Sequence, residues 1–167
     1  MEAKTARVRV AAAAVNFPDV LLIADEYQLS VPAPFIPGSE FAGEVLEVAD
    51  DVRNVAVGDR VFGSTMVGAF AEEVVVTATS LTRIPEGVEA RQAAAFGVAH
   101  RTAFHALRSF ARVRSGDELI VLGAGGGVGL AAVQLGVVLG ATVTAVASSA
   151  PKLDVARANG ATRLVDH

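Results

Sequence analysis

The chain has 167 residues, of which 52% are hydrophobic and 19% charged, with a formal net charge of −4 and no cysteine. This composition is too apolar for a disordered chain, and the length suits one domain or two small ones. The lack of cysteine excludes disulfides, thiolate metal sites and cysteine nucleophiles, and the mildly acidic balance argues against nucleic acid as a partner.

The first part of the chain predicts β-structure. Apolar and polar residues alternate over 5–10, as in a half-buried strand. Gly43 lies inside a later strand pattern and indicates a bulge or a close backbone approach. The predicted elements, in chain order, are a strand over 5–10, a short helix over 19–24 after Pro18, a strand over 40–48, a turn and strand over 57–61, and a strand over 70–77. Short strands in succession favour a small β barrel or sandwich.

Beyond Pro85 the pattern changes from strands to an alternation of helices and strands. Gly140 and Gly160 follow two of these helices, where a left-handed C-cap favours glycine. The β-α-β-α-β order predicts a parallel sheet, and the boundary between the two halves falls within residues 88–115. The predicted elements are helices over 89–96 and 99–110, a strand over 118–122, a helix over 128–139, a strand over 142–147, a helix over 151–158, and a strand over 162–165.

A glycine-rich turn connects the first of these parallel strands to its helix. Such a turn lets the pyrophosphate of a dinucleotide approach the backbone and rest on the N–H groups of the helix. The G-x-G-x-x-G spacing is imperfect, because Ala124 takes the place of the first glycine. The alternative is a tight turn that only packs a helix on a sheet. We predict nucleotide binding by Gly123, Ala124, Gly125, Gly126, Gly127, Val128 and Gly129.

The end of the next strand indicates which dinucleotide is bound. An NAD site usually carries an acidic residue there, whereas this chain has Ser148, Ser149 and Lys152, with no acid before Asp154. Hydroxyls and an ammonium group suit the 2′-phosphate of NADP(H). In the alternative, Ser149 only caps the following helix and Lys152 is a solvated surface residue. We favour NADP(H) as the cofactor.

One uncharged stretch, from Leu119 to Pro151, is longer than the roughly 20 residues that span a bilayer. The cluster of glycines within it argues against a continuous membrane helix. The polar residues 1–9 carry both signs of charge and do not resemble a signal peptide. We therefore expect a soluble cytoplasmic protein without a membrane partner.

Several short motifs together resemble the medium-chain dehydrogenase/reductase superfamily, in its zinc-independent NADPH:quinone oxidoreductase branch. The resemblance implies an incomplete GroES-like β-barrel-type domain over 1–98. A partial NADP(H)-binding Rossmann domain over 99–167 follows, so the fold class is α/β plus β. The motifs are Val15-Asn16-Phe17-Pro18-Asp19, Tyr27-Gln28, Pro37-Gly38-Ser39-Glu40-Phe41-Ala42-Gly43, Val57-Gly58-Asp59-Arg60-Val61, Gly68-Ala69-Phe70-Ala71-Glu72, and the glycine turn followed by Ala132-Val133-Gln134-Leu135.

The resemblance also implies that the reaction proceeds without zinc. Zinc-dependent relatives carry Gly-His-Glu where this chain has Gly38-Ser39-Glu40, and they use cysteine as a further ligand. His100 and His105 are separated by about 140° around a helix and do not share a face. We expect no metal site.

By the same resemblance, Asn16 and Tyr27 match positions that line the substrate and nicotinamide pocket. Asn16 can donate through its amide, and Tyr27 can donate or relay a proton through its phenol. Thr102 matches a segment that contacts the cofactor. Each residue also has a purely structural alternative. Asn16 would only cap the following turn, Tyr27 would be an ordinary loop residue, and Thr102 would bond to a backbone carbonyl within its helix. Glu40 and Asp59 are not expected to be catalytic.

Members of this branch are about twice as long as this chain. The pattern predicts that opening strands of the first domain and everything after the third Rossmann strand are lacking, which leaves strand 118–122 at an apolar edge. Relatives commonly dimerise through later strands, so homo-oligomerisation stays open. One hypothesis is an NADPH-dependent reductase that transfers hydride to a quinone or an α,β-unsaturated carbonyl substrate. The other is a truncated, non-catalytic module for nucleotide binding or interaction.

Overall fold

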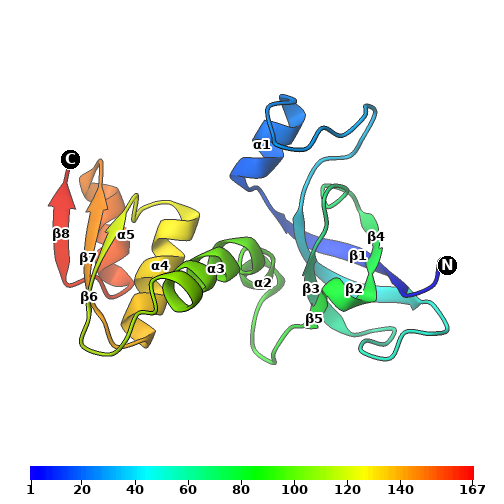
Figure 1. Cartoon of the computed structure of the whole chain (residues 1–167). Coiled ribbons are helices and arrows are strands. Elements are labelled where there is room, and N and C mark those ends of the chain that lie inside the picture. Colours follow the sequence, from blue (N-terminus) through cyan, green and yellow to red (C-terminus); the bar gives the residue numbers. More distant parts are fainter. The chain divides into compact units, whose positions relative to one another are not determined.

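The computed structural model describes residues 1–167 and divides into two compact units, residues 1–97 and 98–167. Figure 1 shows the chain coloured along its sequence, with the antiparallel strands in blue to green and the parallel strands in yellow to red. Each unit has its own sheet and its own core.

The first unit is built on a 5-stranded sheet with the order β4-β1-β2-β3-β5, in which every neighbouring pair is antiparallel. A short helix follows the first strand, and another follows the last. The elements are β1 (Thr5–Ala14), α1 (Phe17–Ile23), β2 (Glu40–Val48), β3 (Arg60–Ser64), β4 (Glu73–Thr77), a 3-10 turn (Ala78–Ser80), β5 (Leu81–Arg83) and α2 (Ala90–Ala94).

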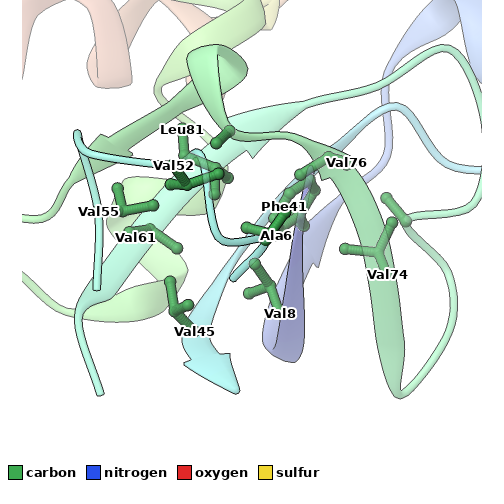
Figure 2. Packing of buried hydrophobic residues seen from close by; sticks show 13 residues of the cluster. Ala6, Val8, Phe41, Val45, Val52, Val55, Val61, Val74, Val76 and Leu81 are labelled. Carbon is green, nitrogen blue, oxygen red and sulfur yellow. The ribbon is translucent and has the colours of Figure 1, made fainter. Parts of the chain in front are cut away.

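The core of the first unit is made of small and β-branched side chains around one aromatic ring. Phe41 on β2 is fully buried, and Figure 2 shows it among the side chains of Val8, Val45 and Val61. Burying an aromatic or aliphatic side chain of this size contributes about 1.5–3 kcal/mol. The alternating apolar residues of β1, β2 and β3 thus fix which face of the sheet is buried.

Gly43 lies at a close approach between β1 and β2. The register passes from the pair Val10–Gly43 to the pair Ala12–Ala42, so Ala11 is the extra residue of a bulge. A side chain at position 43 would collide with the carbonyl of Arg9. The expected bulge and close approach are both confirmed.

Arg7 ties three strands together on the exposed face. Its guanidinium donates to Glu73 on β4 and to Glu47 on β2, each over 2.9 Å. These hydrogen bonds, that to Glu73 first, raise the pKa of Arg7. Because exposed ion pairs contribute little to stability, the buried face remains the main determinant of the fold.

The second unit contains a 3-stranded parallel sheet with the order β6-β7-β8. Helices α4 and α5 pack on it and supply the crossovers that parallel pairing requires. The elements are α3 (Gly97–Phe104), which starts at the last residue of the first unit, a π-helical segment (His105–Phe110), β6 (Glu118–Leu122), α4 (Gly127–Val138), β7 (Thr142–Ala147), α5 (Ala150–Ala158) and β8 (Arg163–Asp166).

Glycines set the approach of helices and strands in the second unit. A Cβ at Gly136 would meet the side chain of Leu119 at 2.6 Å, so only glycine lets α4 lie this close to the sheet. Gly140 and Gly160 have φ values of +83° and +102°, which confirms the predicted left-handed C-caps. Val143, at the centre of β7, is fully buried.

Most predicted elements agree with the structure, and the strands over 40–48, 118–122 and 142–147 have the expected bounds. Strand β1 runs on to Ala14, and β4 begins at Glu73 rather than at residue 70. Strand β5 was not predicted, because three residues carry too little periodicity. The predicted edge strand is confirmed: Leu122 on β6 is 76% exposed. None of the helices is both long enough and apolar enough to span a bilayer.

Candidate functional site

The glycine-rich turn lies between β6 and α4 and is held by backbone hydrogen bonds. Gly123 has a φ of +68°, which favours glycine, and its carbonyl accepts from the N–H of Gly126 at 3.0 Å. Ala124 is fully buried, and its N–H donates to the carbonyl of Val146 at 3.0 Å. The turn is therefore fixed to the end of β7 before any ligand binds.

Two kinds of glycine occur in this turn. Gly129 shapes it, since a side chain there would collide with the carbonyl of Gly123. Gly126 is instead the exposed N-cap of α4, with φ −88° and ψ 168°. A Cβ at this position would have a single neighbouring atom within 4 Å, the carbonyl oxygen of Gly123 at 3.5 Å. Gly127 and Val128 are also exposed. The N-terminus of α4 is thus open and carries N–H groups suited to an anion.

Lys152 lies over the same turn. A Cβ at Gly125 would stand 2.6 Å from the Cβ of Lys152, so the absence of a side chain at Gly125 makes room for the lysine stem. The ammonium of Lys152 donates to the hydroxyl of Ser148 at 3.2 Å. Ser149 is the N-cap of α5, which is the position expected if this residue only caps the helix. The structure thus brings the glycine turn, Ser148 and Lys152 together.

Helix α3 lies next to the turn at Ala99. The Cβ of Ala99 is 3.9 Å from the place that a Cβ at Gly127 would occupy. Thr102 lies one turn further along α3 and is exposed. His100 contacts the amide oxygen of Gln134 at 2.9 Å. The amide nitrogen of Gln134 then donates to Asn159 at 2.7 Å, so that a polar chain links α3, α4 and α5.

In the first unit, Asn16 stands between two buried carboxyl groups. It is the N-cap of α1, and its backbone N–H donates to Asp19 at 2.7 Å in a capping box. Its side-chain nitrogen donates to Glu40 at 3.0 Å and to the carbonyl of Ala14 at 3.5 Å. Asp19 and Glu40 are each 1% exposed. The nitrogen that we expected to donate to a substrate therefore donates to Glu40.

Nothing in the residues around Glu40 singles it out as part of a site. Its position at the start of β2 resembles an ordinary strand end, and burial of a carboxyl group has no local signature. The only available clue was its place directly after Gly38 and Ser39. A Cβ at Gly97 would lie 2.7 Å from Glu40 Oε1, so glycine there leaves room for this carboxyl group.

Tyr27 lies in the loop after α1 and is half-buried. Two residues before it, Asp25 has a φ of +54°, and its carboxylate accepts from the hydroxyl of Ser30 at 2.7 Å. Asp59 accepts from the N–H of Ala56 and from Arg83, each at 2.8 Å, and so stabilises the turn before β3. No group of three or more His, Asp or Glu residues is placed so that it could hold a metal ion.

Comparison with known proteins identifies the family. Residues 2–86 match the model of the alcohol dehydrogenase GroES-like domain. The chain therefore belongs to the alcohol dehydrogenase GroES-like family, within the medium-chain dehydrogenase/reductase superfamily. The antiparallel unit is its GroES-like domain, and the parallel sheet is the start of a Rossmann-type domain.

The relatives include members of the quinone oxidoreductase branch, as the motifs predicted. The quinone oxidoreductase-like protein 2 homolog of Nematostella vectensis is 39% identical over 167 residues, which are 98% of this chain and 46% of that protein. A polyketide synthase of Streptomyces halstedii is 42% identical over 160 residues, 96% of this chain and 3% of that protein.

A solved structure with the same fold is the quinone oxidoreductase of Thermus thermophilus, described with its NADPH complex. It has a TM-score of 0.87 and 35% identity, and the match covers 99% of this chain and 53% of that one. The chain spans about half the length of the quinone oxidoreductases that it matches.

Proposed function

We propose that this chain belongs to an NADPH-dependent oxidoreductase that reduces a quinone or an α,β-unsaturated carbonyl compound without zinc. The observation that carries the proposal is the open N-terminus of α4 with Lys152 and Ser148 beside it. The NADPH complex of the Thermus thermophilus relative supports the choice of cofactor.

The residues of the turn fit a dinucleotide. The exposed N-cap at Gly126 leaves room for a pyrophosphate against the N–H groups of α4, and the helix dipole favours its negative charge. Lys152 and Ser148 supply an ammonium and a hydroxyl for a 2′-phosphate. Ser149 adds a second hydroxyl at the start of α5, and Thr102 is proposed as a further contact. NADPH, when bound, supplies the hydride.

The first unit would serve the acceptor. We assign Tyr27 as the group that donates a hydrogen bond or a proton to the acceptor oxygen, and Asn16 as a residue that orients the acceptor. Such placement of two reactants contributes several kcal/mol to lowering a barrier, about 7–11 in the best cases. Zinc independence is supported by Ser39 in place of the histidine ligand and by the absence of cysteine.

The experiment is turnover by the purified chain with NADPH or NADH, using a 1,4-naphthoquinone and an enoyl thioester as acceptors. We expect quinone reduction with NADPH that is unaffected by a zinc chelator. Faster reduction of the enoyl thioester would instead favour an enoyl reductase activity, the activity named for the structurally similar CurK enoyl reductase. If neither acceptor is reduced although NADPH binds, the chain is a non-catalytic nucleotide-binding module.

A further inference from the structure

Gln134 lies in the middle of α4, and its side-chain amide joins three helices of the second unit. The amide oxygen lies 2.9 Å from Nε2 of His100 on α3, and the amide nitrogen donates to Oδ1 of Asn159 at 2.7 Å. Asn159 is the C-cap of α5. All three side chains are half-buried. The proposed reaction gives no role to this polar chain, although it connects helices that lie beside the glycine turn.

The direction of each hydrogen bond in this chain follows from one end. The side-chain nitrogen of Asn159 donates to the carbonyl of Val155 at 2.8 Å, and a carbonyl only accepts. The side-chain oxygen of Asn159 therefore faces Gln134, which turns its nitrogen toward Asn159 and its oxygen toward α3. Because an amide oxygen cannot donate, Nε2 of His100 carries the proton and donates to Gln134. Neither amide can rotate by half a turn without losing two hydrogen bonds.

The two outer helices of this chain, α3 and α5, also reach the glycine turn. The stem of Lys152 on α5 lies against Gly125, where a Cβ would stand 2.6 Å from the Cβ of the lysine. The Cβ of Ala99 on α3 is 3.9 Å from the place that a Cβ at Gly127 would occupy. Thr102 is three positions beyond Ala99 and so lies on the same face of α3. The polar chain thus connects two helices that both lie beside the proposed nucleotide site.

Helix α3 contacts α4 at two places. Ala99 lies next to the start of α4, and His100 contacts Gln134, which is seven residues further along α4, about 10 Å along the helix axis. Apolar contacts, such as those of the buried Ala103, do not by themselves specify one register between helices. A satisfied polar network does specify a register, because its hydrogen bonds are directional. The contact with Gln134 therefore sets both the position and the rotation of α3.

We propose that Gln134 is a positioning residue, which acts through His100 to hold the Thr102 face of α3 against the part of NADPH beyond its adenosine half. This proposal rests on the proposed binding of NADPH at the glycine turn. The 2′-phosphate contacts of Ser148 and Lys152 lie at the start of α5 and do not depend on α3. Loss of the Gln134 amide should therefore affect the two halves of the dinucleotide unequally.

The first test compares two ligands of different length. The probe 2′,5′-ADP carries the 2′-phosphate but no nicotinamide half, so it would use α5 and the turn, whereas NADPH would also reach α3. Gln134→Met keeps the length of the side chain without its hydrogen bonds. We expect the Kd for NADPH to rise about three- to tenfold in this variant, and the Kd for 2′,5′-ADP to change less than twofold. An equal loss for both ligands, a loss for 2′,5′-ADP alone, or no loss at all overturns the proposal.

Arg163→Met is the matched control for this comparison. It removes another hydrogen bond between two elements of the same unit, the one that Arg163 donates to Glu118 at 2.8 Å. This bond joins β8 to β6 and involves none of the three helices of the polar chain. We expect both Kd values to stay within twofold of the wild type. A selective loss of NADPH affinity in Arg163→Met as well would show that the effect is not specific to Gln134, and would overturn the proposal.

The second test uses His100 and does not depend on the folding of Gln134→Met. His100→Gln places an amide nitrogen near the former position of Nε2 and can still donate to Gln134, whereas His100→Leu cannot. We expect His100→Gln to bind NADPH about three- to tenfold more tightly than His100→Leu, with equal affinity of the two variants for 2′,5′-ADP. Equal affinities for NADPH overturn the proposal.

The wild type separates failure of this proposal from failure of the proposed function. A wild-type chain that binds neither NADPH nor 2′,5′-ADP contradicts the proposed function, and the role of Gln134 with it. A wild type that binds both ligands, together with a Gln134→Met variant that binds them equally well, leaves NADPH binding in place and overturns only the role of Gln134.

Discussion

Replacing Gly126 by aspartate separates ligand binding at the glycine turn from its folding. Gly126 is the N-cap of α4 with φ −88° and ψ 168°, a conformation that any residue adopts, and a Cβ there has no contact nearer than 3.5 Å. Aspartate is among the preferred N-cap residues, and its charge is favourable near a helix N-terminus by about 0.3–1 kcal/mol. The folded state should therefore be as stable as the wild type or slightly more stable.

The same carboxylate would stand where the pyrophosphate is proposed to rest. Two like charges about 4 Å apart repel by about 4 kcal/mol at an effective dielectric constant of about 20, and salt reduces this at an exposed site. A loss of about 2–4 kcal/mol corresponds to a Kd for NADPH that is about 30- to 1,000-fold higher. Gly126→Asp should thus raise the Kd without lowering the melting temperature.

The assay is titration of NADPH fluorescence, with the melting temperature of each variant measured in parallel. Gly126→Asn is the matched control, because it has the size and capping ability of aspartate without the charge, and it should weaken NADPH less. Gly129→Ala should instead disturb the turn itself, since its Cβ would collide with the carbonyl of Gly123. A Gly126→Asp variant that binds NADPH within threefold of the wild type would refute the placement of the pyrophosphate.

Three further predictions concern Lys152, Gly43 and Phe41. Lys152→Ala should weaken NADPH by about 10-fold or more and NADH little, because one charge-assisted contact is lost; equal losses in the two titrations would remove the assignment of the 2′-phosphate. Gly43→Ala should unfold the first unit at lower denaturant, because its Cβ collides with the carbonyl of Arg9, whereas an unchanged midpoint would contradict the close approach. Phe41→Ala should lower the free energy of unfolding by about 3–5 kcal/mol, and a loss below about 1 kcal/mol would show that the ring is not the centre of the core.

The sequence was most informative where a periodic pattern and its boundary signals agreed. Strands β6 and β7 carry apolar runs that end at the glycine turn and at Ser148, so their bounds could be predicted. The end of β1 could not, because Ala11–Ala14 are all alanines, which show no alternation although the backbone continues in the sheet. The π-helical turn at residues 105–110 likewise has no marker among its residues.

The site was predicted in part for the same reason. The glycine turn, Ser148 and Lys152 follow two successive strands of one β-α-β unit, and the carboxyl ends of such parallel strands meet at one edge of the sheet, so their neighbourhood in the structure could be anticipated. Glu40 and Asn16 are 24 positions apart, and their contact depends on the pairing of β1 with β2. Such a contact is set by strand register, which the residues around Glu40 do not reveal.

The central claim is that the second unit recognises NADPH through the N-terminus of α4 and the pair formed by Lys152 and Ser148. Isothermal titration of the chain with NADPH and with NADH, at about 0.15 M salt, where the Debye length is about 8 Å, tests it most directly. We predict that NADPH binds at least about tenfold more tightly than NADH, because its 2′-phosphate makes one additional charge-assisted contact with Lys152. Equal affinities, or no heat of binding with either dinucleotide, would contradict the account.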